Sequence, residues 1–252
     1  MYREERLAKI IELLGKNGHM TVNKLAEHLD YSIATLNRDL NILEAQNYLR
    51  RSYGAVSLIE DNPPLIDRYK IMRKAKNLIA YEACRHICDG DVIFIDGSST
   101  TEAMGKNLLA KKNVTVITNN VSLFLFLCEN GVDTIILGGR KKEPPYLLGG
   151  RETESAAMLY RVDKLFFSSY SASRDGYISA EEEFEMLRRI MIANAKKTYY
   201  LISEDKLFHP FERALCNFGE ISAVISDFQF DESLRSRYPE VDFITVKEKT
   251  NR

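Results

Sequence analysis

The sequence predicts an α/β protein of two domains, in which a small winged helix-turn-helix domain precedes a larger, mostly parallel α/β domain. Three short helix patterns and a hairpin-like segment fill the first 60 of the 252 residues. A Pro-Pro pair at 63–64 then interrupts the pattern. Beyond it, apolar β-rich runs alternate with helical patterns, which is typical of a parallel sheet covered by helices. We therefore expect domains at 1–60 and 75–252, with a linker and the start of a connecting helix at 61–74.

Composition and charge exclude several classes of protein. With 45% hydrophobic and 28% charged residues, the chain has the composition of an ordinary globular protein, unlike disordered or fibrous chains. The longest apolar stretch, 121–128, is far shorter than the ~20 residues that span a bilayer, and the charged N-terminus leads into no apolar signal segment. We therefore expect a cytoplasmic protein without a membrane partner. The cysteines show no Cys-x-x-Cys pair, so we expect no metal site.

Three amphipathic helix patterns occupy the first 45 residues. The first should end at the turn 15–18, Thr21 should cap the second, and a turn at 30–32 should end with Ser32 capping the third. Apolar residues recur at helical spacing on one face of each pattern. These faces are Leu7, Ile10, Ile11 and Leu14, then Val22, Leu25, Ala26 and Leu29, then Ile33, Leu36, Leu40 and Leu43.

The third helix carries a polar face opposite its apolar stripe, and a hairpin-like segment follows at 48–58. Arginine can fork onto guanine, asparagine onto adenine, and threonine can reach a phosphate or a thymine methyl group. A hairpin of this kind forms a wing that meets the DNA backbone. The candidate DNA-binding residues are Ser32, Ala34, Thr35, Asn37, Arg38, Asn41, Arg50, Arg51 and Tyr53.

The charge balance argues against DNA binding. Residues 1–60 contain eight Lys or Arg and eight Asp or Glu, and the chain has a net charge of -1, whereas a DNA-binding domain is usually basic. The same pattern also fits a small helical docking module whose polar face is merely solvated.

Four short segments of this region share a characteristic spacing. They are Arg6-Leu7-x-x-Ile10, Val22-x-x-Leu25-Ala26, Ser32-x-x-Thr35-Leu36-Asn37-Arg38-Asp39-Leu40-x-x-Leu43-Glu44 and Leu49-x-Arg51-x-Tyr53-Gly54. This spacing resembles the DNA-binding region of DeoR-family transcriptional regulators, and the resemblance implies binding to operator DNA. The sequence departs from the family pattern at Asn37, where an arginine is typical, at Tyr53, where a histidine is typical, and at Ala55, where a glycine is typical.

Strand and helix patterns alternate after the linker. A helix at 68–87 carries basic residues at 68, 70, 73, 74 and 76, which we interpret as a solvated face, with a DNA or interdomain contact as the alternative. The expected strands are 91–96, 114–118, 134–137, 164–168, 197–202 and 223–226. The expected helices lie at about 100–110, 120–130, 152–161 and 181–195. Ligands of such sheets bind beyond the carboxyl ends of the strands.

The strongest candidate site is the loop that follows the first of these strands. After Asp96 and Gly97 come four consecutive hydroxyl side chains and then a helix, whose unpaired N–H groups favour a phosphate. Capping explains one hydroxyl but not four. The other candidate residues have plainer alternatives, because glycines also form turns and an isolated Lys or Arg is usually solvated. The candidate effector-binding residues are Asp96, Gly97, Ser98, Ser99, Thr100, Thr101, Asn119, Gly138, Gly139, Arg188 and Lys206.

Further segments carry a second resemblance. They are Asp89-Gly90-Asp91-x-Ile93-Phe94-Ile95-Asp96 with the loop 97–101, Val114 to Asn119, Leu137-Gly138-Gly139, Asp163-Lys164-x-Phe166, Lys206 with Phe208, and Ile225-Ser226-Asp227. They resemble the sensor domain of the DeoR family, which is similar to ribose-5-phosphate isomerase, and the resemblance implies that the loop 97–101 holds the phosphate of a sugar effector. The serine-rich segment 167–172 replaces a glycine-rich turn of the family, and Ser203 stands where Asp is frequent.

Two main hypotheses follow. The first is a repressor of carbohydrate-metabolism genes, which binds double-stranded operator DNA as a homodimer or homotetramer and responds to a small phosphorylated sugar. The second is an enzyme of the sugar-phosphate isomerase class, with Asp96 and residues 181–183 as conceivable acids and bases. A chain that keeps the fold but has lost effector recognition is a third. We favour the repressor, without catalytic residues or cofactor, because a helix-turn-helix has no role in catalysis.

Overall fold

The computed structural model describes residues 3–17, 19–45, 49–52, 55–58, 73–142 and 146–247. The chain divides into two compact units, Met1–Pro64 and Leu65–Arg252. Tyr53, the expected connector at 59–64 and the expected helical residues 68–72 lie outside the described residues.

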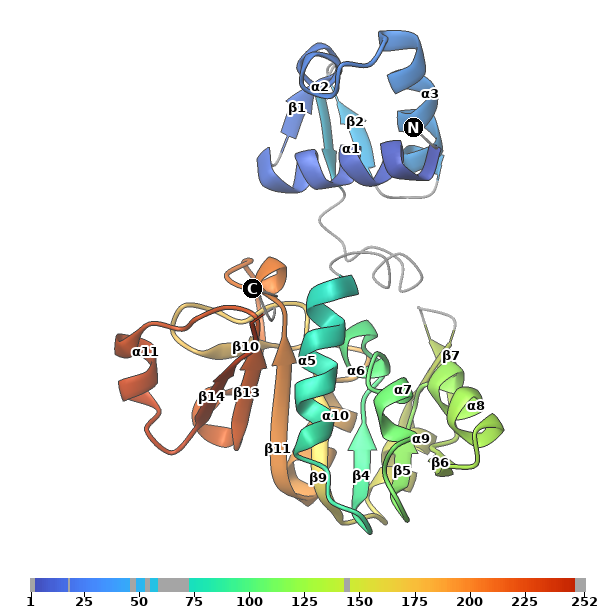
Figure 1. Ribbon diagram of the computed structural model, residues 1–252, viewed down its shortest axis with the longest axis vertical. Helices are drawn as coiled ribbons and strands as arrows, with labels where there is room; N and C mark the ends of the chain where they lie inside the picture. Colours follow the sequence, from blue (N-terminus) through green and yellow to red (C-terminus); the bar gives the residue numbers. More distant parts are fainter. Residues whose placement is uncertain are drawn as a thin grey trace, which may run out of the picture. The chain divides into compact units, whose positions relative to one another are not determined.

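The N-terminal unit combines three helices with a small antiparallel sheet (Figure 1). Strand β3 pairs with β2, which confirms the expected hairpin, and also with β1, which gives the sheet the order β1-β3-β2. The sequence interpretation missed β1, because three residues are too few to show an alternating pattern. The elements are α1 (Arg3–Asn17), β1 (His19–Thr21), α2 (Val22–Leu29), α3 (Ile33–Ala45), β2 (Leu49–Ser52) and β3 (Ala55–Leu58).

Both expected helix caps are confirmed. The Thr21 hydroxyl accepts a hydrogen bond from the Lys24 amide at 3.3 Å, and the Ser32 hydroxyl accepts one from the Thr35 amide at 3.2 Å. The expected end of the first helix is wrong, since α1 continues to Asn17. The Asn17 side chain donates to the carbonyl of Leu13, which satisfies one of the acceptors that a helix end leaves open.

The three apolar helix faces form the core of this unit, with one exception. Ile33 is 52% exposed. It lies at the edge of the stripe and is the first residue of α3, so no preceding turn of the helix packs beside it. Helix α3 is also tied to α1 by Arg6, whose guanidinium donates to both carboxylate oxygens of the buried Asp39 at 2.7 and 3.0 Å. The buried apolar residues are Ile10, Leu14, Met20, Leu25, Ala26, Leu36, Leu40, Leu43, Leu49 and Val56.

The C-terminal unit is built on a seven-stranded sheet in the order β14-β13-β11-β9-β4-β5-β6. Every neighbouring pair in it is parallel, as the alternating sequence pattern predicted. The last strand, β14, was not expected. The strands are β4 (Val92–Ile95), β5 (Thr115–Thr118), β6 (Asp133–Ile136), β9 (Val162–Phe167), β11 (Ala195–Ile202), β13 (Ala223–Ser226) and β14 (Asp242–Thr245).

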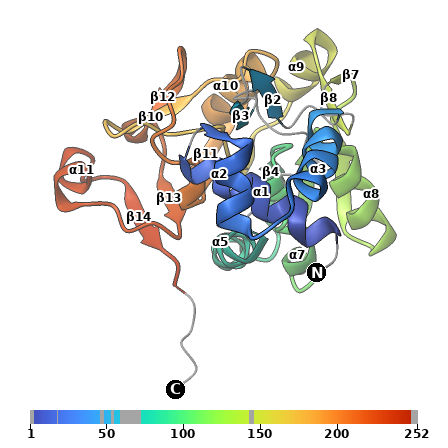
Figure 2. The same cartoon turned by 90° about the horizontal axis from the view of Figure 1, so that it is seen from above.

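Helices cover both faces of this sheet. Figure 2 shows α5 and α7 on one side of the sheet and α9 and α10 on the other. The helix expected at about 100–110 is wrong, because a turn at 103–104 divides it into α6 and α7. The helices are α5 (Arg73–Arg85), α6 (Ser99–Glu102), α7 (Gly105–Leu108), α8 (Val121–Glu129), α9 (Arg151–Ala157), α10 (Glu185–Asn194) and α11 (Glu232–Arg237).

Two antiparallel strand pairs lie outside the main sheet, and the sequence interpretation missed both. Strand β7 (Arg140–Lys142) pairs with β8 (Leu147–Gly149), and β10 (Tyr177–Ser179) pairs with β12 (Ala214–Asn217). Each strand has only three or four residues, and the partners of the second pair are far apart in the sequence.

The strands send alternate side chains to two hydrophobic clusters, as the twofold period of a β-strand requires. Ile93 and Ile95 pack in the cluster that contains residues of α5, α7 and α8, whereas Phe94 packs in the one that contains residues of α9 and α10. The sheet is therefore the middle of three layers. Within the described part of the chain, no helix is long and apolar enough to cross a membrane.

Replacing Leu40 by alanine should unfold the N-terminal unit selectively, because Leu40 is fully buried in its core. We expect a loss of ~2–5 kcal/mol, seen as faster amide hydrogen exchange in residues 3–45 of the full-length protein and unchanged exchange in residues 73–247. The matched control is Ile33→Ala on the same helix, which should cost less than ~1 kcal/mol. Equal effects of the two substitutions would contradict the packing described above.

Candidate functional site

The loop after β4 lies at the point where the topology of the sheet changes direction. From β4 the chain passes through α6 and α7 to β5 on one side, and from β9 it passes through α10 to β11 on the other. Because β4 and β9 are neighbours, the two loops that follow them diverge at the same edge of the sheet. Open α/β sheets bind ligands at such a switch point. The sequence placed the loop 97–101 after a strand, but it could not place it beside β9.

The carboxylate of Asp96 holds the two loops together. The side chain is only 3% exposed. One oxygen accepts hydrogen bonds from the amide of Ser98 at 3.1 Å and from the hydroxyl of Thr101 at 2.7 Å. The other accepts the amide of Ser168, in the loop after β9, at 3.2 Å, and lies 3.2 Å from Nη2 of Arg188. Asp96 is thus fully engaged by its own chain.

The four hydroxyls of the loop divide into two pairs. Ser98 is the N-cap of α6, since its hydroxyl accepts the amide of Thr101 at 3.1 Å, and the hydroxyl of Thr101 bonds to Asp96. Among the described residues, the buried hydroxyl of Thr100 has no hydrogen-bond partner, and the amides of Gly97, Ser99 and Thr100 donate no hydrogen bond. Capping therefore explains the hydroxyl of Ser98 and the contact with Asp96 explains that of Thr101, while three amides and one hydroxyl remain as polar groups for a ligand.

A buried lysine lies beside this loop. Lys76 of α5 is 3% exposed, and its ammonium donates to the hydroxyl of Ser99 at 3.1 Å. The interpretation of the basic run as a solvated face is therefore wrong for this residue. The sequence contains a signal for this burial. Lys76 stands three and four residues before Ile79 and Ala80, which places it on the apolar face of α5.

Arg188 lies between two carboxylates. Its Nη2 is 3.2 Å from Asp96 and 3.5 Å from Glu181, and the residue is 5% exposed. Burial alone lowers the pKa of this guanidinium, but the negative charges of Glu181 and Asp96 outweigh burial and raise it above its ordinary value. Nε and Nη1 are buried without a hydrogen-bond partner among the described residues. The charge of Arg188 is thus compensated, and two of its nitrogen atoms can still donate hydrogen bonds. Asp96 and Glu181, two of the four carboxylates weighed as acid or base, both face this cation.

The segment after β9 is held by its own serines. The hydroxyl of Ser169 shares a hydrogen bond of 2.7 Å with the phenol of Tyr200, and the amide of Ser171 donates to the hydroxyl of Ser179 at 2.8 Å. Lys206 joins this segment, because its ammonium donates to the carbonyl of Ser169 at 3.1 Å. The buried hydroxyl of Ser203, which follows β11, has no partner among the described residues.

Residues after β5 and β6 meet the hairpin β7–β8. The side-chain amide of Asn119 donates to the carbonyl of Leu148 at 2.9 Å, and its buried oxygen has no partner in the described chain. Leu147 lies directly on Gly97, where a Cβ atom would be 2.3 Å from its Cδ2. Strand β8 therefore lies against this loop at Gly97, and a side chain at position 97 would require Leu147 to shift.

The two glycines after β6, Gly138 and Gly139, contact another part of the protein, the helix α9. A Cβ atom on Gly139, whose φ is +137°, would lie 2.0 Å from the hydroxyl oxygen of Thr153, and that hydroxyl donates to the carbonyl of Gly138 at 2.6 Å. No hydrogen bond within the described residues joins these glycines to Asp96. The conformation of Gly139 is explained by packing against α9, whereas a Cβ atom on Gly138 would have no described neighbour within 4 Å.

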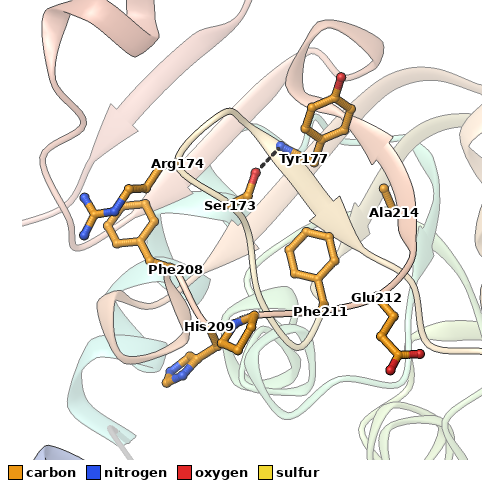
Figure 3. A pocket seen from close by; sticks show the side chains of 9 residues that line it. Ser173, Arg174, Tyr177, Phe208, His209, Phe211, Glu212 and Ala214 are labelled. Carbon is orange, nitrogen blue, oxygen red and sulfur yellow. Dashed lines mark hydrogen bonds between the residues drawn. The ribbon is translucent and has the colours of Figure 1, made fainter.

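A hollow of about 400 Å³ lies between the loop before β10 and the loop before β12. In Figure 3 the guanidinium of Arg174 lies over the ring of Phe208, at 4.4 Å from its centroid, and the hydroxyl of Ser173 accepts the amide of Tyr177. None of the predicted effector-binding residues lines this hollow.

Five of the nine expected DNA-binding residues lie on α3, namely Ala34, Thr35, Asn37, Arg38 and Asn41. Ala34, Arg38 and Asn41 are exposed, and Thr35 and Asn37 are half-buried. Arg38 makes no hydrogen bond or ion pair with any described residue. The hydroxyls of Ser32 and Thr35 bond to each other at 2.9 Å. Arg51 of β2 contacts the side chains of Asn37 and Asn41. Arg50 belongs to the same strand, its side chain being outside the described part, as is Tyr53.

Comparisons with known proteins agree with this architecture. The DeoR-like helix-turn-helix domain matches residues 6–62, and the DeoR C-terminal sensor domain matches residues 71–228. The chain is 33% identical to the HTH-type transcriptional repressor GlcR of Bacillus subtilis (strain 168), over 90% of this chain and 89% of that protein. It is 29% identical to the lactose phosphotransferase system repressor of Lactococcus lactis subsp. lactis, over 82% and 84%.

Among solved structures, ribose 5-phosphate isomerase A of Methanocaldococcus jannaschii is similar to 54% of this chain, over 54% of its own, with 17% identity and a TM-score of 0.41. The family is decided by the sequence matches, which span both units of the chain. The chain belongs to the DeoR family of helix-turn-helix transcriptional regulators.

Proposed function

We propose that this protein is a repressor of carbohydrate-metabolism genes whose affinity for operator DNA is modulated by a small phosphorylated sugar. The observation that supports effector binding is the set of polar groups around the loop 97–101. Three amides, the Thr100 hydroxyl and the Lys76 ammonium gather at the switch point of a parallel sheet. Oriented amides and a buried cation are the groups that bind a phosphate.

The effector binds with its phosphate against Gly97, Ser99 and Thr100. Lys76 supplies positive charge beside the phosphate, since its ammonium contacts the hydroxyl of Ser99. The two unpaired donor atoms of Arg188, the oxygen of Asn119 and the hydroxyl of Ser203 offer hydrogen bonds to the sugar hydroxyls. Buried polar groups without partners cost free energy, so a polyhydroxylated ligand that pairs with them binds favourably.

The proposed DNA binding rests on the surface of α3 and on the function of the relatives. Both GlcR and the lactose phosphotransferase system repressor are named as repressors. The exposed Ala34, Arg38 and Asn41, together with the half-buried Thr35, form the side of α3 that enters the major groove. One such helix reads a short half-site, so we propose a homo-oligomer that reads two half-sites.

The effector acts by binding one DNA-affinity state better than the other, and it shifts the equilibrium by that difference in binding free energy. Lys76 lies in the first turn of α5, the first described element after β3. A phosphate bound at Ser99 therefore acts on the helix that continues from the connection between the two units.

Phosphorylated sugars should raise the melting temperature of the protein, and the same sugars without phosphate should not. A ligand that binds only the folded state adds ~2.7 kcal/mol of stability at 100 times its Kd, and ~2–4 °C per kcal/mol is expected for a chain of this size. The measurement is a thermal-shift series over triose, pentose and hexose phosphates, each paired with its free sugar. If none of the phosphates shifts the melting temperature, effector sensing is refuted. Turnover of one of them would support the isomerase alternative.

Lys76→Met should weaken binding of the phosphorylated sugar while keeping the fold, because methionine fills a similar volume without the charge. A hydrogen bond to a charged group contributes ~1.5–3 kcal/mol, so we expect the Kd of the phosphorylated sugar to rise about tenfold or more by calorimetry. The matched control is Lys74→Met, an exposed lysine of the same turn, which should leave the Kd unchanged. Equal Kd values for the Lys76 variant and the wild type would remove Lys76 from the site.

A further inference from the structure

The guanidinium of Arg51 spans two turns of the helix α3. Its Nη1 donates to Oδ1 of Asn37 at 3.0 Å. Its Nη2 donates to Oδ1 of Asn41 at 2.7 Å and to the backbone carbonyl of Asn37 at 3.2 Å. Its Nε lies 3.4 Å from a carboxylate oxygen of Glu44. Positions 37, 41 and 44 share one face of the helix, so a single side chain of the wing strand contacts a continuous stripe of α3.

The chemistry of arginine fixes how both asparagine amides are turned. Arginine has five N–H donors and no acceptor, whereas an asparagine amide has an oxygen at one end and an NH₂ group at the other. Only the oxygen can face Arg51. The amino groups of Asn37 and Asn41 therefore point to the side away from the guanidinium, and neither amide can flip without losing its bond to Arg51.

The environment of Arg51 also limits its use as a phosphate contact. Three of its five N–H groups donate hydrogen bonds to α3, and the carboxylate of Glu44 balances part of its charge. Two N–H groups of Arg51 remain for a phosphate, and one of them, on the buried Nε, lies beside the carboxylate of Glu44, which disfavours a second anion there. By comparison, Arg38 is exposed and makes no ion pair with any described residue. Its positive charge is therefore accessible to a phosphate or a base.

We propose that Arg51 is a positioning residue of the DNA-reading surface, which sets the amides of Asn37 and Asn41 for base contacts and makes no phosphate contact of its own. The proposal rests on the proposed DNA-reading role of α3. Side chains held in their reading geometry lose less freedom on binding, which improves discrimination between bases. Asn37 is what makes the fork possible, because an arginine at this position could not accept a hydrogen bond and would repel Arg51.

The salt dependence of binding separates the two roles of an arginine. Loss of a phosphate contact weakens binding to all sequences alike and reduces the slope of log K against log salt concentration by about 1. Loss of a residue that positions base-reading groups lowers the preference for the specific sequence and leaves the slope unchanged.

The experiment uses the full-length protein and the DNA duplex that it binds most tightly after selection from a random-sequence library. A scrambled duplex of equal composition is the non-specific probe. The Kd values for both duplexes are measured between 50 and 200 mM salt, a range of about fourfold, for the wild type, Arg51→Met and Arg51→Lys. Lysine keeps the positive charge, but its single ammonium cannot copy the planar fork that reaches both asparagines. Amide hydrogen exchange of residues 3–45 verifies that each variant is folded.

We expect both variants to lose at least about fivefold of the specific to non-specific affinity ratio at an unchanged salt slope. The effect should vanish in a background that carries Asn37→Ala and Asn41→Ala, because Arg51 acts through those two residues. The proposal is overturned if Arg51→Met lowers the salt slope by about 1 and keeps the affinity ratio, or if Arg51→Lys behaves as the wild type. A wild-type protein that recovers no preferred duplex would refute the proposed DNA reading itself, and the inference with it.

Discussion

The carboxylate of Asp96 links the parts of the C-terminal unit that meet at the carboxyl edge of its sheet. It accepts hydrogen bonds from the loop after β4 and from the loop after β9, and it pairs with Arg188 of α10. These segments leave neighbouring strands for opposite faces of the sheet, so backbone pairing alone does not hold them together. A buried carboxylate with several donors supplies that link at low cost, because each of its oxygens is satisfied.

The same arrangement decides which polar groups remain for a ligand. The hydroxyl of Ser98 is used as a helix cap and that of Thr101 in a hydrogen bond to Asp96. The two carboxylates beside Arg188 balance its charge. Lys76 is buried next to the donors that remain. A phosphate bound at Ser99 would therefore lie beside a buried positive charge.

In the N-terminal unit, two arginines from outside α3 fix that helix. Arg6 of α1 donates hydrogen bonds to the buried Asp39, and Arg51 of the wing strand donates hydrogen bonds to Asn37 and Asn41. The first contact lies on the inner side of the helix and the second beside its polar face. The orientation of the helix and the orientation of two of its side chains are therefore set by different elements of the same small unit.

Periodicity determined most of the architecture, because a helix face or a parallel strand is encoded by neighbouring residues. The three apolar faces of the first unit, the caps Thr21 and Ser32 and the parallel sheet could all be predicted in this way. Ile33 failed only because it stands at a helix end. The short strands β1, β7, β8, β10, β12 and β14 could not be predicted, since each is defined by a partner rather than by its own pattern.

The loop 97–101 was visible in the sequence as a run of hydroxyls after a strand, but which of them remain for a ligand was not. That depended on contacts between distant residues, such as Asp96 with Ser168 and Lys76 with Ser99. Likewise, the sequence determined that Arg51 belongs to a wing and Asn37 to a helix, and only the tertiary structure brought them together. Residue type and spacing fix local conformation, whereas the partner of a side chain is decided by elements that meet only when the chain has folded.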